Sequence, residues 1–155
     1  MHKVLISDAM DSIAEKILLS NNIKVDVKTD FTVDELIENI PLYDGLIVRS
    51  ATKVTKEILE KAKNLKIIGR AGAGVDNIDL LSAKEKNIIV MNTPGGNTNA
   101  TAEHTLALLL SLSRKISKAD ITTHNGDWAK KKLKGNEIRG KTIGIIGFGN
   151  VGKRF

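Results

Sequence analysis

The 155-residue sequence contains no cysteine, only two prolines and few aromatic residues (3%). Without cysteine, the chain has no disulfide, no thiolate metal ligand and no thiol nucleophile, so CxxC redox chemistry is excluded. The longest apolar run, residues 106–110, is far shorter than the ~18 residues of a membrane span. Few apolar residues separate Met1 from Asp8, which is unlike a secretory signal. We therefore expect a soluble, cytoplasmic protein.

The charge is unevenly distributed. The apolar fraction of 41% and charged fraction of 27% are typical of a folded chain, and the net charge is +6. Residues 1–100 carry 13 Lys/Arg against 14 Asp/Glu, whereas residues 101–155 carry 11 against four. The basic excess therefore belongs to the last third, as either a solvated face or an anion-binding site.

Short apolar runs alternate with amphipathic segments through the first hundred residues. Thr32 and Glu35 form a capping-box pattern at the start of one such segment. The pattern predicts strands at residues 3–7, 23–27, 45–49, 65–69 and 88–91, and helices at residues 11–20, 32–39, 55–62 and 79–84. Because parallel strands need crossover connections, we expect an α/β fold: a flavodoxin-like parallel sheet with helices on both faces.

The pattern changes after residue 98. A long apolar segment, residues 99–117, predicts a buried helix that connects two domains. A polar stretch, residues 118–140, holds Trp128 and the lysine cluster at residues 130–134. Residues 141–146 predict a buried strand. We therefore divide the chain into a substrate domain, residues 1–98, and a connector with the first βα unit of a Rossmann domain, residues 99–155.

Three glycines follow that strand in the dinucleotide-binding pattern G-x-G-x-x-G: Gly147, Gly149 and Gly152. The first permits a tight turn, the second lets the backbone approach a pyrophosphate, and the third lets the helix pack closely. A predicted strand leads into the pattern, which favours nucleotide binding over a simple glycine turn. The acidic residue that binds the ribose is expected about twenty residues further on, past residue 155, so we expect an N-terminal fragment of a longer protein.

A second glycine-rich loop, residues 69–74, follows the fourth predicted strand and includes Arg70. Arg49 ends the third predicted strand, and Ser50 follows it. These residues should meet at the carboxyl edge of the sheet, where open α/β folds bind ligands. Two arginines beside backbone amides suit a small anionic ligand, although two structural arginines at strand ends are the alternative.

Five segments together resemble the D-isomer-specific 2-hydroxyacid dehydrogenases: residues 45–54, 68–79, 90–97, 102–105 and 140–152. Within that family, they are most similar to members that act on a phosphorylated 2-hydroxy acid. The resemblance implies an NAD-dependent oxidoreductase that works as a homodimer or a higher homo-oligomer. It also implies that the polar arm after the connector reaches the neighbouring subunit, where Lys130 would add positive charge to the substrate site.

The resemblance also assigns individual positions. The substrate would be bound by Arg49, Ser50, Arg70, the amides of Ala71 and Gly72, Asn97 and Lys130. The cofactor would be bound by Ala73, Gly147, Gly149, Asn150, Val151 and Gly152. Position 73 is often threonine in the family, with its hydroxyl near the nicotinamide, and Ala73 lacks that hydroxyl.

The catalytic residues of the family are an arginine, a glutamate and a histidine, which we expect to lie past residue 155. None of the three histidines, His2, His104 and His124, occurs in the matching motif, so we assign no catalytic residue here. His104 is expected to be a buried structural histidine on the connector helix. No metal site is expected.

Other functions compete with this interpretation. Family members that act on glyoxylate, hydroxypyruvate or lactate share the same fold and glycine pattern. A non-enzymatic flavodoxin-like binding module is another alternative, but a receiver module has its phosphate-accepting aspartate where this chain has Arg49. Only Trp128 and Phe148 offer stacking surfaces to a nucleic acid before Phe155, so neither a nucleic acid nor a membrane is an expected partner.

Overall fold

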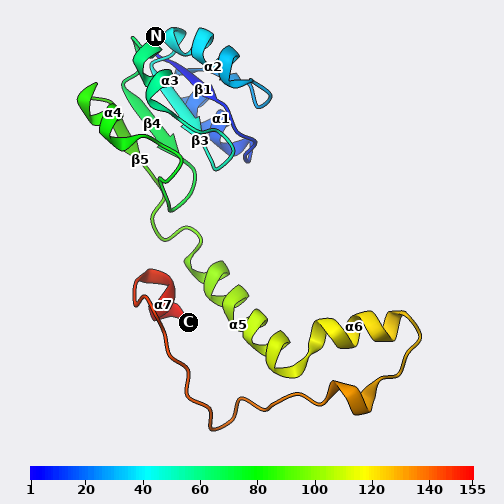
Figure 1. Ribbon diagram of the computed structural model, residues 1–155. Coiled ribbons are helices and arrows are strands. Elements are labelled where there is room, and N and C mark those ends of the chain that lie inside the picture. The colour runs from blue at the N-terminus through cyan, green and yellow to red at the C-terminus, as the bar shows by residue number, and fades with distance from the viewer. The chain divides into compact units, whose positions relative to one another are not determined.

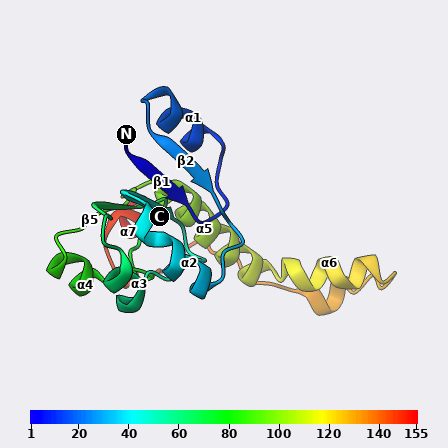
Figure 2. The same ribbon diagram turned by 90° about the horizontal axis from the view of Figure 1, so that it is seen from above.

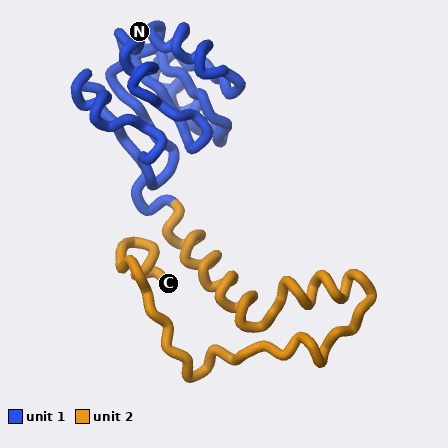
Figure 3. Tube along the Cα trace, in the orientation of Figure 1, with its two compact units in different colours: residues 1–96 blue, residues 97–155 orange.

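A computed structural model describes residues 1–155, and the chain forms two compact units, residues 1–96 and residues 97–155 (Figure 3). Each unit is described by itself. No helix in either unit combines the length and the hydropathy that a membrane span requires.

Unit 1 is built on a five-stranded sheet in which all neighbouring strands are parallel (Figure 1). The strands run in the order β2-β1-β3-β4-β5. They are β1 (Lys3–Ile6), β2 (Lys24–Val27), β3 (Gly45–Val48), β4 (Ile67–Arg70) and β5 (Ile89–Met91). This order is that of the flavodoxin-like doubly wound sheet, and it confirms the predicted α/β fold class.

The helices of unit 1 lie on both faces of the sheet, as predicted. They are α1 (Ile13–Ser20), α2 (Val33–Asn39), α3 (Lys56–Lys61) and α4 (Leu80–Glu85), with a 3-10 turn η1 (Ile40–Leu42) after α2. The capping box of α2 is confirmed: the amide of Glu35 donates to Thr32 Oγ1 at 3.2 Å, and the amide of Thr32 donates to Glu35 Oε2 at 2.8 Å.

The main core lies on the sheet face that α2, α3 and α4 cover. Leu5, Leu46 and Ile68 are register partners across β1, β3 and β4, and each is at most 1% exposed. Figure 2 shows α1 on the opposite face, beside β1 and β2. The part of that face on β4 and β5 is less covered, because Ile67 and Ile89 remain 36% and 60% exposed.

Unit 2 contains α5 (Thr98–Arg114), α6 (Ile116–His124), a 3-10 turn η2 (Lys130–Leu133) and α7 (Asn150–Arg154). The single helix predicted at residues 99–117 is wrong, because Lys115 adopts a left-handed conformation (φ 55°) that ends α5. Neither α6 nor η2 was predicted as a separate element: α6 begins inside the predicted helix and continues into the stretch interpreted as polar connection, and η2 lies within that stretch.

The predicted burial of the connector helix is also wrong. Ala102 is the one buried residue of α5, while Leu108 and Leu112 are 57% and 80% exposed and His104 is exposed as well. Burial of an apolar helix requires a matching apolar surface, and the contacts of α5 with α6 and α7 within unit 2 leave these leucines uncovered. His104 is therefore not the buried structural histidine that the sequence analysis expected.

The buried strand predicted at residues 141–146 does not form. Ile143, Ile145 and Ile146 in this segment are all exposed. A strand depends on backbone hydrogen bonds to a neighbouring strand, and unit 2 contains no other strand that could supply them. The apolar composition of this segment is typical of a β-strand, but a strand forms only where a neighbouring strand is available for hydrogen bonding.

Candidate functional site

The carboxyl edge of the sheet begins at Asp8, directly after β1. Asp8 is 5% exposed, and its carboxylate accepts the amide of Arg49 at 2.6 Å and the hydroxyl of Thr52 at 2.6 Å. The amide of Thr52 also donates to Asp8, at 3.1 Å. Burial raises the pKa of Asp8, but the bonds from Thr52 and the amides of Arg49 and Ala51 outweigh it and hold the pKa below its ordinary value. Asp8 is therefore ionised and organises the segment after β3.

Asn77 binds carbonyl groups of the segment whose amides bind Asp8. Its Nδ2 donates to the carbonyl oxygens of Arg49 at 2.8 Å and of Thr52 at 2.6 Å. Its Oδ1 accepts a hydrogen bond from Arg70 Nε at 3.3 Å. One amide group thus links the ends of β3 and β4, which carry the two predicted arginines.

The two arginines are held differently. Arg49 is exposed, and its Nη1 donates to the carbonyl oxygen of Ala9 at 2.9 Å. The side chain of Arg70 is only 14% exposed, and its Nη2 lies 3.9 Å from Asp76 Oδ1. Ser50, next to Arg49, is exposed and its hydroxyl makes no hydrogen bond within the chain. The structure therefore brings Arg49, Ser50 and Arg70 to one edge of unit 1.

The glycine-rich loop after β4 presents unpaired amides. The amides of Ala71 and Gly72 are occupied, because they donate to the carbonyl oxygens of Val48 and Arg70, each at 2.8 Å. The next three amides, at residues 73–75, have no partner within the chain. The loop carbonyls are anchored instead, since Asn92 Nδ2 donates to Ala73 O at 2.7 Å. Successive unpaired amides of this kind suit an anion such as a carboxylate.

Two hollows lie beside the segment that follows β3, and neither is lined by Arg49, Arg70 or the glycine-rich loop. A hollow of about 580 Å³ is lined in part by Ser50, Lys53, Lys56 and Asn77. A second hollow, of about 240 Å³, is lined in part by Asp8 and Thr52 and shares Lys53 with the first. Residues 50–53 separate the two hollows, so the conformation of this short segment shapes both.

The dinucleotide pattern in unit 2 has the geometry that its glycines suggest. Gly147 has a φ of +95°, which favours glycine, and it makes the tight turn. A side chain at Gly152 would collide with the carbonyl oxygen of Gly147, whereas nothing lies within 4 Å of a Cβ placed on Gly149. Gly149 therefore leaves open space beside the backbone, as a pyrophosphate requires.

The amides that follow are also available. The first helical hydrogen bond runs from the amide of Lys153 to the carbonyl of Gly149 at 3.0 Å, and no side chain caps α7. The amides of Asn150 and Val151 thus precede the first bond of the helix and can donate to a ligand. The loop therefore fits a dinucleotide.

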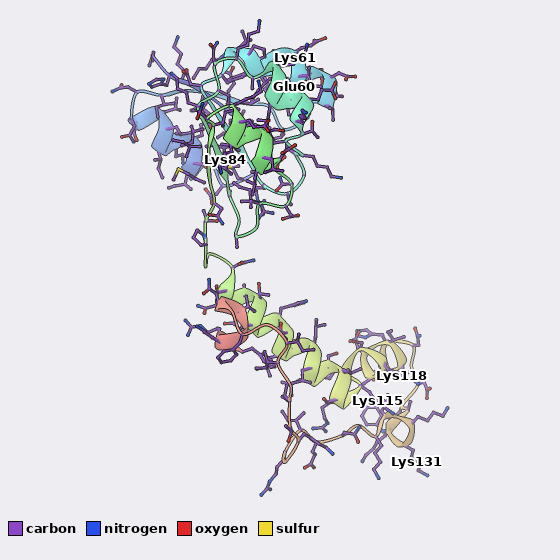
Figure 4. All side chains as sticks on the ribbon, turned by 60° about the vertical axis from the view of Figure 1, so that its left-hand side comes forward. Glu60, Lys61, Lys84, Lys115, Lys118 and Lys131 are labelled. Carbon is purple, nitrogen blue, oxygen red and sulfur yellow. The ribbon has the colours of Figure 1, made fainter.

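The remaining predicted site residues also lie in unit 2. Asn97 occupies the N-cap position of α5 without a side-chain hydrogen bond, and Lys130 begins η2. Lys115, Lys118 and Lys131 are exposed on the corner after α5, on α6 and on η2 (Figure 4). Unit 2 thus carries an exposed positive surface drawn from three elements. No group of His, Asp and Glu side chains is placed to hold a metal ion.

The sequence analysis missed the residues that hold the carboxyl edge together. Asp8, Thr52, Asn77 and Asn92 were not assigned to the site. Asp8, Thr52 and Asn92 are short polar residues within four positions of a strand end, where such side chains bind backbone groups. Asn77 lies seven residues after β4 and carried no such signal.

The fold and the glycine pattern define an α/β chain that carries a dinucleotide-binding sequence pattern, and comparison with known proteins identifies its family. The sequence profile of the D-isomer specific 2-hydroxyacid dehydrogenase catalytic domain matches residues 4–148. The chain belongs to this family.

Three of the proteins that this chain is similar to carry more specific names. The chain is 50% identical over 150 residues to D-3-phosphoglycerate dehydrogenase of Archaeoglobus fulgidus, with 97% of this chain and 28% of that protein covered. It is 48% identical over 153 residues to hydroxypyruvate reductase of Thermotoga maritima, with 98% and 50% covered. The structure of NAD+-bound 3-phosphoglycerate dehydrogenase of Entamoeba histolytica superposes with a TM-score of 0.78 at 36% identity, covering 99% of this chain and 48% of that one. The chain thus spans half or less of the length of these relatives.

Proposed function

We propose that this chain is part of an NAD-dependent D-3-phosphoglycerate dehydrogenase. This cytoplasmic enzyme would oxidise 3-phospho-D-glycerate to 3-phosphooxypyruvate, the first step of L-serine biosynthesis. The proposal draws support from the 50% identity to the Archaeoglobus fulgidus enzyme. The shared fold alone would not distinguish one 2-hydroxy acid from another.

One observation carries the substrate class: Asn77 links Arg49 and Arg70 at an edge that also presents unpaired amides. A simple 2-hydroxy acid has one anionic group, whereas 3-phosphoglycerate has two. The guanidinium groups suit the phosphate, and the amides at residues 73–75 suit the carboxylate. Ala71 and Gly72 remain predicted contacts, but their amides already donate to Val48 and Arg70, so Ala73 and Gly74 join the proposed carboxylate site.

The cofactor would be held by the glycine loop of unit 2. Gly147 and Gly152 would shape the loop, Gly149 would leave room for the pyrophosphate, and the amides of Asn150 and Val151 would donate to it. NAD would supply the hydride acceptor, and the protein supplies orientation and charge.

The catalytic proton transfer would come from residues outside this chain. His2 is 3.3 Å from Asp44 at the start of β1, which is the opposite edge of the sheet from Arg49. His104 and His124 lie on exposed helices of unit 2, and His124 is paired with Asp120 at 3.2 Å. We therefore expect purified residues 1–155 to form no NADH from 3-phosphoglycerate; any enzyme-dependent NADH formation would contradict this.

The exposed lysines of unit 2 have a place in the same proposal. Lys130 and its neighbours would supply positive charge to the phosphate site of a second subunit, in a homodimer or a larger homo-oligomer. Such charge attracts a doubly anionic substrate, and the effect weakens with salt. Asn97 remains a predicted substrate contact.

The test of the proposed function uses the full-length protein that contains this chain. kcat/KM is measured with 3-phosphoglycerate, glycerate and lactate, each with NAD and with NADP. We expect the highest value for 3-phosphoglycerate with NAD, and Arg49→Ala should lower it more than tenfold while affecting lactate less. Equal values for phosphorylated and unphosphorylated acids would overturn the proposal.

Hydroxypyruvate reduction is the second candidate, because the Thermotoga maritima relative is 48% identical and bears that name. The two candidates differ by one phosphate group. Assays in the reductive direction with 3-phosphooxypyruvate and hydroxypyruvate distinguish them, since only the former should depend on both Arg49 and Arg70.

A further inference from the structure

We propose that Asp8 and Asn77 act as positioning residues for substrate binding. Together they hold residues 49–52 in the conformation that presents Arg49 and Ser50 and keeps them in register with Arg70. The inference rests on the proposed function, because it concerns the same carboxyl edge.

Asp8 fixes residues 49–52 by accepting hydrogen bonds from N–H groups of this segment. Its carboxylate accepts the amides of Arg49 and Thr52 and the Thr52 hydroxyl, the shortest bonds being 2.6 Å. The same hydroxyl lies 3.0 Å from Ser7 Oγ, which extends the network back along β1. A buried carboxylate that receives several donors sets a local backbone conformation, because each donor must point toward it.

Asn77 fixes the same segment by donating hydrogen bonds to carbonyl groups of the segment. Its Nδ2 lies between the carbonyl oxygens of Arg49 and Thr52, at 2.8 and 2.6 Å. Amides and carbonyls of the segment are therefore bound by two side chains from different parts of the sequence. This leaves the side chain of Ser50 without an internal partner and free for a ligand.

Asn77 also couples the two arginines. The Asn77 side-chain amide donates to the carbonyl oxygen of Arg49 and accepts a hydrogen bond from Arg70 Nε. A shift of one strand end is therefore transmitted to the other. A ligand with two anionic groups requires a defined separation between its binding groups, and loss of this separation weakens binding.

The charge of Asp8 is satisfied without using either arginine. Its partners are backbone amides and a hydroxyl, and neither guanidinium forms an ion pair with it. Arg49 instead donates to the carbonyl of Ala9, a neutral acceptor. The positive charge of Arg49 thus stays available for an anionic substrate, although a buried carboxylate lies one strand away.

The experiment compares variants in the full-length protein. Asn77→Ala removes all three bonds of the side chain. Thr52→Val removes the hydroxyl that donates to Asp8 and contacts Ser7 Oγ, and keeps the bond from the Thr52 amide to Asp8. Asn64→Ala is the matched control, since Asn64 Nδ2 donates to a carbonyl, Pro41 O, at 2.7 Å near the opposite edge. kcat, KM for 3-phosphoglycerate, KM for NAD and the melting temperature are measured for each.

We expect Asn77→Ala to raise the KM for 3-phosphoglycerate about tenfold and Thr52→Val severalfold, with the KM for NAD within twofold of wild type. Thr52→Ser should restore the wild-type KM. Asn64→Ala should change neither KM, whatever it does to the melting temperature. If Asn77→Ala lowers the melting temperature with both KM values unchanged, its role is only structural and the inference is wrong.

A double-mutant cycle tests whether Asn77 acts through the arginine. In an Arg70→Ala background, Asn77→Ala should raise the KM much less than in wild type; full additivity would contradict the inference. The proposed function can fail separately. If wild type shows no preference for the phosphorylated acid, the substrate class is wrong, and the positioning role is then measured on the KM of the preferred acid.

Discussion

The guanidinium of Arg70 lies across the backbone of Gly72, in the space that a side chain at Gly72 would occupy. Gly72 does not have a positive φ, so its backbone conformation does not require glycine. The position of the Arg70 guanidinium is the reason that a side chain does not fit there. The space is filled by a side chain two residues earlier, which is only 14% exposed and is held by Asn77.

Gly72→Ala should therefore displace Arg70 and weaken substrate binding. A Cβ at this position would lie 2.9 Å from Arg70 Cζ, and the flexible side chain would move away and lose its bond to Asn77. In the full-length protein, we expect a severalfold rise in the KM for 3-phosphoglycerate and a stability loss of about 1 kcal/mol or less. Gly69→Ala is the control, because its Cβ would meet only Ile47 Cγ1 at 3.7 Å, an ordinary contact. Equal KM values for the two variants would contradict the role assigned to Gly72.

Tyr43 should titrate far from its ordinary range. It is 3% exposed, and its hydroxyl donates to Asp26 Oδ2 at 2.8 Å. Burial and then the charge of Asp26 raise the pKa of Tyr43 to about 12. Because this pKa is above the unfolded value of about 10, its contribution to stability is present below pH 10 and is lost as the pH rises toward 12.

The measurement is direct, because Tyr43 is the only tyrosine in the chain. Phenolate absorbance of the folded chain should show a midpoint near 12, and the same chain in denaturant should titrate near 10. Asp26→Asn should lower the folded midpoint, because it removes the negative charge that opposes ionisation. A folded wild-type midpoint near 10 would show that Tyr43 is not buried against Asp26.

Asp44 should make the chain sensitive to acid. Lys66 Nζ donates to Asp44 Oδ1 at 2.9 Å, and the amide of Lys3 donates to Oδ2 at 3.0 Å. The bond from Lys66, with those from Lys3 and His2, holds the pKa of Asp44 well below its usual value. The stabilisation is therefore complete above the unfolded value near 4 and is lost as the pH falls below it.

Asp44→Asn should accordingly flatten the dependence of the unfolding free energy on pH below about 4. Asp30→Asn is a suitable comparison, because the Asp30 side chain makes no hydrogen bond or ion pair within the chain. Chemical denaturation at several pH values measures both. If the two variants show the same pH dependence, Asp44 does not carry the acid sensitivity.

Limited proteolysis should distinguish the two units. Arg139 and Lys141 lie in an exposed segment that belongs to no helix or strand, whereas β1 to β5 are hydrogen-bonded in a sheet. Trypsin should therefore cut after Arg139 and Lys141 before it cuts between β1 and β5, as mass spectrometry of a time course would show. Simultaneous cleavage in the sheet would mean that unit 1 is no more stable than this segment.

Local signals in the sequence predicted much of unit 1. The alternation of apolar runs with amphipathic segments predicted the strands of a parallel sheet, and the spacing of Thr32 and Glu35 predicted a capping box. These features depend on residues a few positions apart, so the sequence shows them directly. The spacing of Gly147, Gly149 and Gly152 likewise predicted a turn whose local geometry the structure contains.

Long-range contacts determined the rest. Residues 141–146 have the composition of a buried strand, yet they form none, because no neighbouring strand in unit 2 offers hydrogen bonds. The apolar residues of α5 look like those of a buried helix, yet most stay exposed, because no apolar surface in unit 2 covers them.

The candidate site shows the same division. The sequence by itself determined that Arg49 and Arg70 follow successive strands of a parallel sheet, and hence that they share an edge. Only the tertiary structure decided how that edge is held: Asp8 binds an amide 41 residues away, and Asn77 binds carbonyls 28 and 25 residues away. Such pairs have no signature in sequence spacing, because the folding of the sheet brings their partners together.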